Sequence, residues 1–331
     1  MIAAGLLAGV LAVLGSTLPV PMVALGPGPT YDTLGEVNGT AVVSVEGLPT
    51  YPTSGHLNLT TVAVSDRLTL FTVLGMWVAD DRQVVPRNQV FPPQLSDEQV
   101  HRENSRQFLA SEVNAQAAAL AQLGIPTRVV VAEVVPGSPA EGTLEVTDEI
   151  VAVAGRPVDT PTALMDALAH TTPGQSVTVT YRRAGELRTV DVVLGASPDR
   201  PQGLLGVRPG VEPRHGDITI RLGDIGGPSA GLMFALAVVD LLTPGELTGG
   251  RFIAGTGAIT PDGQVQPIGG IAFKMAAAHA AGAEVFLVPA ENCAEAAAHA
   301  PEGLTLVKVS TLGEAISALE GLGTGTPPVT C

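Results

Sequence analysis

Residues 226–231 read Gly-Gly-Pro-Ser-Ala-Gly, and residues 263–274 read Gly-Gln-Val-Gln-Pro-Ile-Gly-Gly-Ile-Ala-Phe-Lys. The first stretch follows a strand pattern and leads into a helix pattern over residues 229–242. The second leads into a helix pattern over residues 271–281. Strand and helix patterns alternate in this way from residue 204 onward. The carboxyl-terminal part is therefore predicted to be an α/β sandwich with mixed strands.

Ser229 stands where the glycine-rich loop meets the expected helix. One interpretation is structural, because serine is a preferred helix N-cap and glycines form the turn before it. The other is catalytic: a serine at this place lies beside backbone N–H groups and the positive end of the helix dipole, which suit a developing oxyanion. In the catalytic interpretation Gly227, Pro228 and Ala230 form the oxyanion loop.

A nucleophilic serine needs a base, and histidine is one candidate. Residues 227–231 formally match the Gly-x-Ser-x-Gly elbow of α/β-hydrolases, and His279 and His299 follow it. That elbow places the serine directly after a strand, whereas six residues separate Ser229 from the preceding strand pattern here. In addition, both histidines fall in helix patterns. An α/β-hydrolase esterase stays an alternative.

Lysine is the second candidate base, and it is scarce. The chain has 17 Lys and Arg residues, of which only Lys274 and Lys308 are lysines. Helical spacing places Lys274 on or beside an apolar face, where burial lowers the pKa of an amine. Only a neutral lysine can accept a serine proton, which arginine cannot do. The alternative is a lysine whose stem covers apolar surface while its ammonium stays in water. Lys308 is expected at the surface.

The motifs over residues 226–290 resemble the proteolytic domain of Lon proteases. They comprise Gly-Pro-Ser-Ala-Gly, Thr-Gly-Ala-Ile at residues 256–259, the stretch 263–270, Lys274, and Val-Pro-Ala-Glu-Asn at residues 288–292. The resemblance implies a Ser-Lys dyad with Ser229 as nucleophile and Lys274 as general base, and Thr256 as a hydrogen-bond partner of the lysine. Ala258 stands where Lon has an acid, and Gly226 where Lon has an aspartate. Asp224 is therefore a candidate for a supporting role.

Residues 127–194 have a different pattern, with strands at 129–135 and 149–153, a capped helix from Thr160 to His170, and a closing hairpin. This order resembles a bacterial PDZ domain, which binds extended peptides at an open sheet edge. The resemblance implies that Leu123, Gly124 and Ile125 form the carboxylate-binding loop. The alternative is a β-rich packing module without a ligand.

The amino-terminal residues carry no charged side chain before Asp32, and residues 1–25 are almost all apolar or small. About 20 such residues span a bilayer as a helix. We expect a single-pass membrane anchor or a cleaved signal peptide, with the catalytic part outside the cytoplasm.

The order of these parts resembles membrane-anchored PDZ-containing Lon-like serine proteases of the YlbL type. It implies an anchor and exit at 1–31, an amino-terminal part of the protease at 32–124, an inserted PDZ domain at 125–197, a catalytic domain at 198–320 and a flexible tail at 321–331. The expected fold class is thus α+β and α/β. The family also suggests a homo-oligomer, a hexameric ring.

Several functions are excluded or disfavoured by composition. The net charge of −15 argues against nucleic-acid binding. No phosphate-binding Gly-x-x-x-x-Gly-Lys-[Ser/Thr] motif occurs, so no ATPase domain is encoded, and no cofactor or metal is expected. Cys293 and Cys331 could form a disulfide outside the cytoplasm.

The predicted function is an ATP-independent serine endopeptidase. Its partners would be peptides or unfolded proteins, bound by the PDZ domain and the active site, and a membrane, contacted through the amino-terminal segment. A PDZ adaptor or chaperone with an inactive protease domain is the non-enzymatic alternative.

Overall fold

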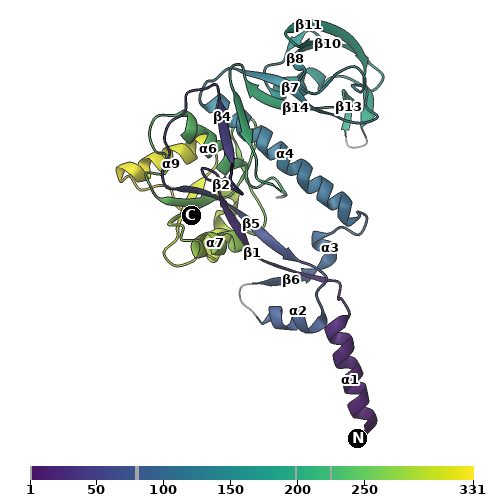
Figure 1. The fold of residues 1–331 in the computed structure, drawn as a ribbon, viewed down its shortest axis with the longest axis vertical. Helices are drawn as coiled ribbons and strands as arrows, with labels where there is room; N and C mark the ends of the chain where they lie inside the picture. The colour runs from purple at the N-terminus through teal and green to yellow at the C-terminus, as the bar shows by residue number, and fades with distance from the viewer. Residues whose placement is uncertain (1, 79–81, 198–199, 224–225) are drawn as a thin grey trace.

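The computed structural model describes residues 2–78, 82–197, 200–223 and 226–331 (Figure 1). Its centre is a six-stranded sheet with the strand order β20-β19-β16-β5-β1-β6. β16, β19 and β20 run parallel to β5, whereas β1 is antiparallel to both β5 and β6. The strands are β1 (Met22–Asp32), β5 (His56–Ser65), β6 (Gln83–Pro86), β16 (Phe252–Gly255), β19 (Val285–Pro289) and β20 (Thr305–Val309).

Helices cover both faces of this sheet, because its strands are apolar on both sides. In β19, Val285 and Leu287 join a core with three helices, while Phe286 and Val288 join a second core on the opposite face. The first core contains side chains of α4 (Asp97–Gln122), α6 (Gly231–Leu242) and α9 (Leu312–Thr324), and the second those of α7 (Ile271–Ala280) and α8 (Cys293–Ala298).

The central sheet combines segments from both sides of an inserted unit. β1, β5 and β6 precede this unit in the sequence, and β16, β19 and β20 follow it. Short pairs of strands complete the part of the chain around the central sheet: β2 (Glu36–Val37) with β3 (Thr40–Ala41), β4 (Val43–Glu46) with β15 (Asp217–Ile220), and β17 (Ala258–Ile259) with β18 (Val265–Gln266).

The inserted unit has its own sheet and its own core, and it lies at the top of Figure 1. Its strand order is β11-β10-β8-β7-β14, with β9 beside β8, so β14 forms one edge. The elements are β7 (Thr127–Val134), β8 (Glu149–Val153), β9 (Arg156–Pro157), α5 (Pro161–Leu168), β10 (Ser176–Arg183), β11 (Glu186–Val193), β12 (Gly195–Ser197), β13 (Arg200–Leu204) and β14 (Val207–Pro213).

The inserted unit is longer than the sequence indicated. β14 pairs with β7 along its whole length, from Val207 opposite Val134 to Pro213 opposite Thr127. A boundary at residue 197 would separate this strand from its sheet. The unit therefore continues to residue 213.

The amino-terminal segment differs from the prediction of one apolar span. Helix α1 covers Ile2–Thr17 and ends before Pro19, and residues 26–31 belong to β1 instead of an irregular exit. Among the helices that the structure describes, none combines the length and the apolar character needed to cross a membrane. Two further short helices, α2 (Leu70–Trp77) and α3 (Arg87–Val90), flank β6.

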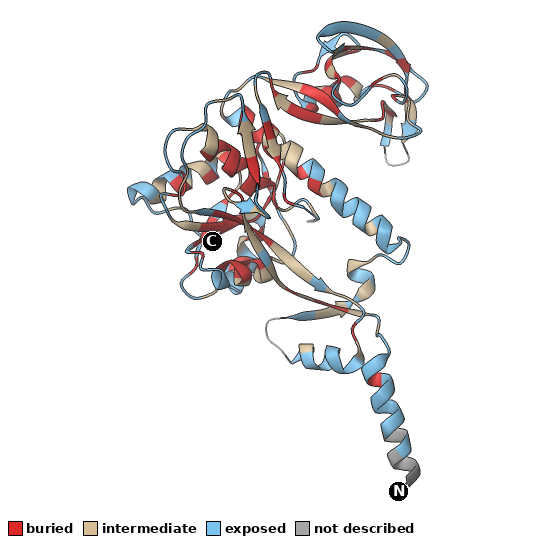
Figure 2. Ribbon diagram, in the orientation of Figure 1, coloured by how far each residue is buried: buried red, intermediate tan, exposed pale blue. Residues whose placement is uncertain are grey.

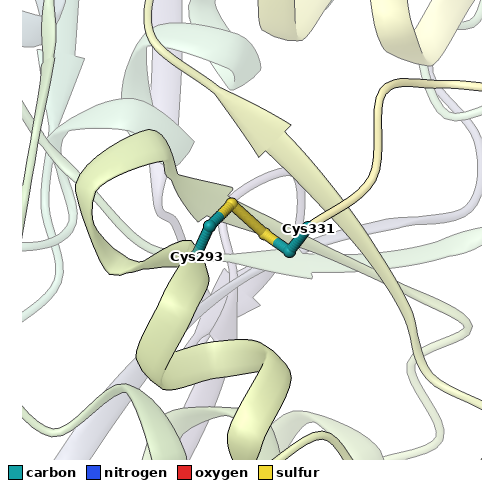
Figure 3. The surroundings of a disulfide bond; sticks show 2 residues. All are labelled: Cys293 and Cys331. Atoms are coloured by element: carbon teal, nitrogen blue, oxygen red, sulfur yellow. A yellow bond between two sulfur atoms is a disulfide. The ribbon is translucent and has the colours of Figure 1, made fainter.

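The carboxyl-terminal tail is held to the domain, although a flexible tail was expected. Cys293 and Cys331 form a disulfide (Figure 3). Thr330 also makes a β-bridge with Val307, and the Lys308 N–H donates to the Val329 carbonyl at 2.9 Å. The end of the chain thus covers the β20 edge of the central sheet.

Candidate active site

Ser229 lies in the loop immediately before α6. The N-cap of that helix is Ala230, and no side chain caps it, so the Ser229 hydroxyl does not perform the capping role that sequence allowed. The Ser229 carbonyl accepts hydrogen bonds from the Gly257 N–H at 2.9 Å and from the Thr256 hydroxyl at 3.1 Å. These two bonds fix the backbone of Ser229 and leave its side chain directed elsewhere.

Lys274 reaches Ser229 from α7. That helix begins after Gly270, which has a φ of 71°, a left-handed conformation that favours glycine. Lys274 lies one turn into the helix and is 3% exposed. Its Nζ is 2.8 Å from the Ser229 Oγ, 2.9 Å from the Thr60 carbonyl oxygen and 3.2 Å from the Thr256 Oγ1. The structure thus brings together Ser229, Lys274 and Thr256.

Burial lowers the pKa of Lys274 from 10.5 to about 8. A neutral amine has two N–H groups and one lone pair. The Thr60 carbonyl can only accept, and the Thr256 hydroxyl already donates its hydrogen to Ser229, so each takes one N–H of the amine. The remaining lone pair is left for the Ser229 hydroxyl, which then donates to Nζ. The arrangement orients Lys274 as a proton acceptor.

Helix α4 supports the loop before Ser229. The Ser111 hydroxyl, on a residue that is 3% exposed, donates to the Pro228 carbonyl at 2.9 Å. The Asn104 carbonyl accepts from the Gly227 N–H at 3.0 Å. Gly227 has a φ of 90°, so the turn at this point requires glycine. The loop is therefore fixed by a helix that lies outside the motifs that contain Ser229 and Lys274.

A cleft of about 570 Å³ opens over Ser229 and Lys274. Apolar side chains line it on both sides, among them Pro29, Val62 and Ile268. In the described part of the chain, the N–H groups of Ser229 and Ala230 donate to no backbone carbonyl. They are thus free to bind an oxyanion formed above Ser229. Gly227 cannot contribute in this way, because its N–H is already bonded to Asn104.

The remaining sequence candidates fall outside this cluster. His279 and His299 are exposed and do not line the cleft, and the His299 Nδ1 lies 3.0 Å from its own helix carbonyl at Glu295. Asp224 lies outside the described residues. Within the described residues, no group of His, Cys, Asp and Glu side chains is arranged to hold a metal ion.

Three contributors were not predicted from the sequence, namely Thr60, Asn104 and Ser111, and Asn104 takes part through its backbone carbonyl. Thr60 lies in β5 and takes part through its backbone carbonyl, which any residue could supply, so no side-chain motif marks it. Ser111 lies in the long helix α4, where serine is ordinary. The only signal for Ser111 was its position among buried alanines on one face of that helix.

Comparison with known proteins agrees with this geometry. Residues 223–320 match the model of the Lon protease (S16) C-terminal proteolytic domain, and residues 97–194 match a PDZ domain model. This chain carries a Lon-type proteolytic domain and a PDZ domain. It is 37% identical over 94 residues to the Lon protease of Rhizobium meliloti, which is 28% of this chain and 11% of that enzyme. It is 46% identical over 66 residues to the Lon protease of Escherichia coli, which is 20% of this chain and 8% of that enzyme.

The chain thus spans about a tenth of the length of these Lon proteases. Solved structures match about a quarter of the chain. The PDZ domain of an SdrC-like protein from Listeria innocua is 21% identical, and the match covers 25% of this chain and 92% of that chain, with a TM-score of 0.24. A Geobacillus thermodenitrificans solution structure is 34% identical, with 24% of this chain and 94% of that chain covered and a TM-score of 0.23.

The PDZ domain contains a groove of about 230 Å³ between α5 and the strand β14. Gly203, Gly206 and Val207 line one side of the groove, and Leu164 and Met165 line the other. β14 is an edge strand, so its outer backbone groups are open to an added peptide strand. Residues 203–206, the end of β13 and the turn after it, come directly before this strand, at the place where a PDZ domain has its carboxylate-binding loop.

The predicted carboxylate-binding loop at Leu123, Gly124 and Ile125 is therefore corrected. Leu123 is the C-cap of α4, and Gly124 has a φ of 65°, which ends the helix. Leu123 and Ile125 pack against the protease core instead of lining the PDZ groove. A helix terminus produced the apolar-Gly-apolar pattern that suggested a binding loop.

Proposed function

We propose that this chain is a serine endopeptidase that uses Ser229 and Lys274 as a catalytic dyad. The 2.8 Å contact between Lys274 Nζ and Ser229 Oγ carries the proposal. It is supported by the burial that keeps the amine available in its neutral form and by the match to the Lon proteolytic domain.

In the proposed reaction the Ser229 Oγ attacks the scissile carbonyl carbon while its proton passes to Lys274 Nζ. The tetrahedral oxyanion accepts hydrogen bonds from the N–H groups of Ser229 and Ala230. The Lys274 ammonium then protonates the amine leaving group as the C–N bond breaks. Water, deprotonated by the same lysine, hydrolyses the acyl-enzyme and restores Ser229.

The PDZ groove supplies the substrate preference in this proposal. An extended carboxyl-terminal segment would pair with the open edge of β14, and its carboxylate would meet the backbone N–H groups of Leu205 and Gly206. Unfolded or PDZ-presented proteins are therefore the proposed substrates. Their hydrolysis would proceed without ATP.

We also propose that the catalytic part works outside the cytoplasm, next to a membrane that the amino-terminal segment contacts. The disulfide between Cys293 and Cys331 supports an oxidising compartment. The uncharged sequence ahead of Asp32 supports the membrane contact. The attachment of the carboxyl-terminal tail by this disulfide would depend on an oxidising compartment.

Hydrolysis of an unfolded protein without ATP tests the proposed function. Wild-type chain is expected to degrade casein, and Ser229→Ala to lower the rate at least about a thousandfold, because this change removes the hydroxyl that lies 2.8 Å from the Lys274 amine. Ser105→Ala is a matched control, since Ser105 is an exposed serine outside the loop. Equal rates for wild type and Ser229→Ala would refute the dyad.

A further inference from the structure

Within the described residues, helix α2 packs against no surface that buries its apolar side chains. Its eight residues read Leu-Phe-Thr-Val-Leu-Gly-Met-Trp, and none of them is buried. Phe71 is 50% exposed and Trp77 is 76% exposed. Apolar side chains gathered on a surface in this way indicate a contact that is absent from the isolated chain.

α2 and α1 form one apolar unit at the end of the molecule. Figure 2 shows both helices exposed below the sheet, with α1 extending away from the body. The Val20 N–H donates to the Leu68 carbonyl at 2.8 Å, and Pro19 and Thr69 form a β-bridge, which ties the bases of the two helices together. A Cβ atom added at Gly15 would lie 3.0 Å from the Phe71 ring, so the helices touch at that point.

The character of this unit points to lipid. Exposed positions in α2 are distributed around most of the helix circumference, whereas a protein groove needs only an apolar stripe. No charged residue occurs between Leu68 and Val78. Trp77, the single tryptophan of the chain, lies at the helix end, and tryptophan is enriched where a bilayer meets water.

We propose that α2 is a second membrane contact, inserted into the surface of the bilayer beside α1. The inference deepens the membrane contact proposed above and rests on it. The net charge of −15 opposes attraction to anionic lipids, so the contact is hydrophobic and forms on zwitterionic lipid. It does not require that either helix cross the bilayer.

The contact would set the distance of the active site from the membrane. β1 starts at the base of the helices and reaches the cleft at Pro29. Seven residues of strand correspond to roughly 20 Å. A membrane-attached substrate would therefore need an extended segment of about that length outside the lipid before it could reach Ser229.

Trp77 fluorescence tests the proposal directly on the full chain. With phosphatidylcholine vesicles we expect a blue shift of the Trp77 emission. The shift should be the same at about 150 mM and about 500 mM salt, because a hydrophobic contact does not depend on the electrostatic attraction that salt screens. We also expect quenching by lipids brominated near the headgroup. Unchanged emission, or equal access of aqueous iodide with and without vesicles, would overturn the proposal. So would a blue shift that follows protein concentration without lipid, because a second copy would then cover α2.

A paired substitution gives an independent readout. Leu70→Ser/Leu74→Ser changes two exposed residues of α2 and keeps Trp77. We expect at least about tenfold weaker partitioning into the vesicles, and unchanged cleavage of soluble casein. Leu187→Ser, at a residue that is 59% exposed in the PDZ domain, is the matched control and should partition as wild type does. Equal partitioning of the α2 variant would overturn the proposal, whereas loss of casein cleavage by the wild type would concern the proposed function alone.

Discussion

The catalytic cleft and the PDZ groove differ in whether their hydrogen-bonding groups already have partners. In the cleft, the amine of Lys274 is buried and each of its neighbours has a fixed hydrogen-bonding role. In the groove, the edge strand β14 leaves its outer backbone groups open, and Met165 is 62% exposed. Proton transfer requires a closed set of donors and acceptors, whereas peptide recognition by strand addition requires an edge without a partner.

Removal of one acceptor in the cleft should have the largest effect among changes that spare the dyad. Thr256→Val keeps the shape of the side chain, but the Lys274 amine loses the acceptor that orients its lone pair. We expect kcat to fall by about tenfold to a hundredfold for short peptides and for PDZ-presented proteins alike. Steady-state kinetics on both substrates would measure this. An effect confined to one substrate class would contradict the assigned role of Thr256.

The next largest effect is expected from pH, which should change the rate of cleavage at the cleft but not peptide binding at the PDZ groove. Because the pKa of Lys274 is about 8, we expect kcat/KM to fall about tenfold for each pH unit below that value. Peptide binding to the PDZ groove should stay constant over the same range. Rates measured from pH 6 to 9, beside peptide binding by fluorescence anisotropy, would test this. A flat rate profile would show that Lys274 is not the base.

The same pKa shift links Lys274 to stability. Between pH 8 and 10.5 the unfolded lysine binds more protons than the folded one, so the free energy of unfolding should rise with pH in this window. Below about pH 8 the buried Lys274 amine is protonated in the folded state, so the full cost of burying its charge lowers the free energy of unfolding. Urea unfolding of wild type and Lys274→Met at pH 7.5 and 9.5 would measure it, with a smaller pH dependence expected in the variant.

A substitution in the PDZ groove should affect recognition without affecting chemistry. Met165→Glu places a negative charge in the groove, where a peptide carboxylate is expected, so binding of a carboxyl-terminal peptide should weaken about tenfold. Cleavage of a short peptide that does not use the groove should be unchanged. Gly124→Asn is the control, because asparagine tolerates the left-handed backbone there and residue 124 lies outside the groove. Weaker peptide binding by Gly124→Asn would indicate that residues 123–125 bind the peptide carboxylate after all.

The smallest effect is expected from the support of the nucleophile loop. Ser111→Ala leaves the Pro228 carbonyl without its partner from α4. We expect a few-fold loss of kcat with little change in KM, because the loop that carries Ser229 shifts while the apolar lining at Pro29, Val62 and Ile268 stays in place. Ser111→Thr should restore part of the rate, and Ser105→Ala should have no effect. A rise in KM with kcat unchanged would indicate a role in substrate binding instead.

The sequence predicted the mixed α/β sandwich and placed Ser229, Lys274 and Thr256 in motifs that the structure brings together. This was feasible because each motif includes its own turn and helix start. Thr60 could not be found, because its contribution depends on the pairing of distant strands. Strand pairing also explains why one apolar span over residues 1–25 was expected at the amino terminus. The apolar pattern continues to Leu25, but residues from Met22 onward pair with β5 and β6 in the central sheet.

The central claim is that a neutral Lys274 takes the proton of Ser229. The most direct measurement compares kcat/KM for a short peptide in Lys274→Met and in Lys308→Met, the same change at the other lysine of the chain. The account predicts at least about a thousandfold loss for Lys274→Met, with folding no less stable than that of the wild type, and an unchanged rate for Lys308→Met. A folded Lys274→Met enzyme that keeps a tenth of the wild-type rate or more would contradict it.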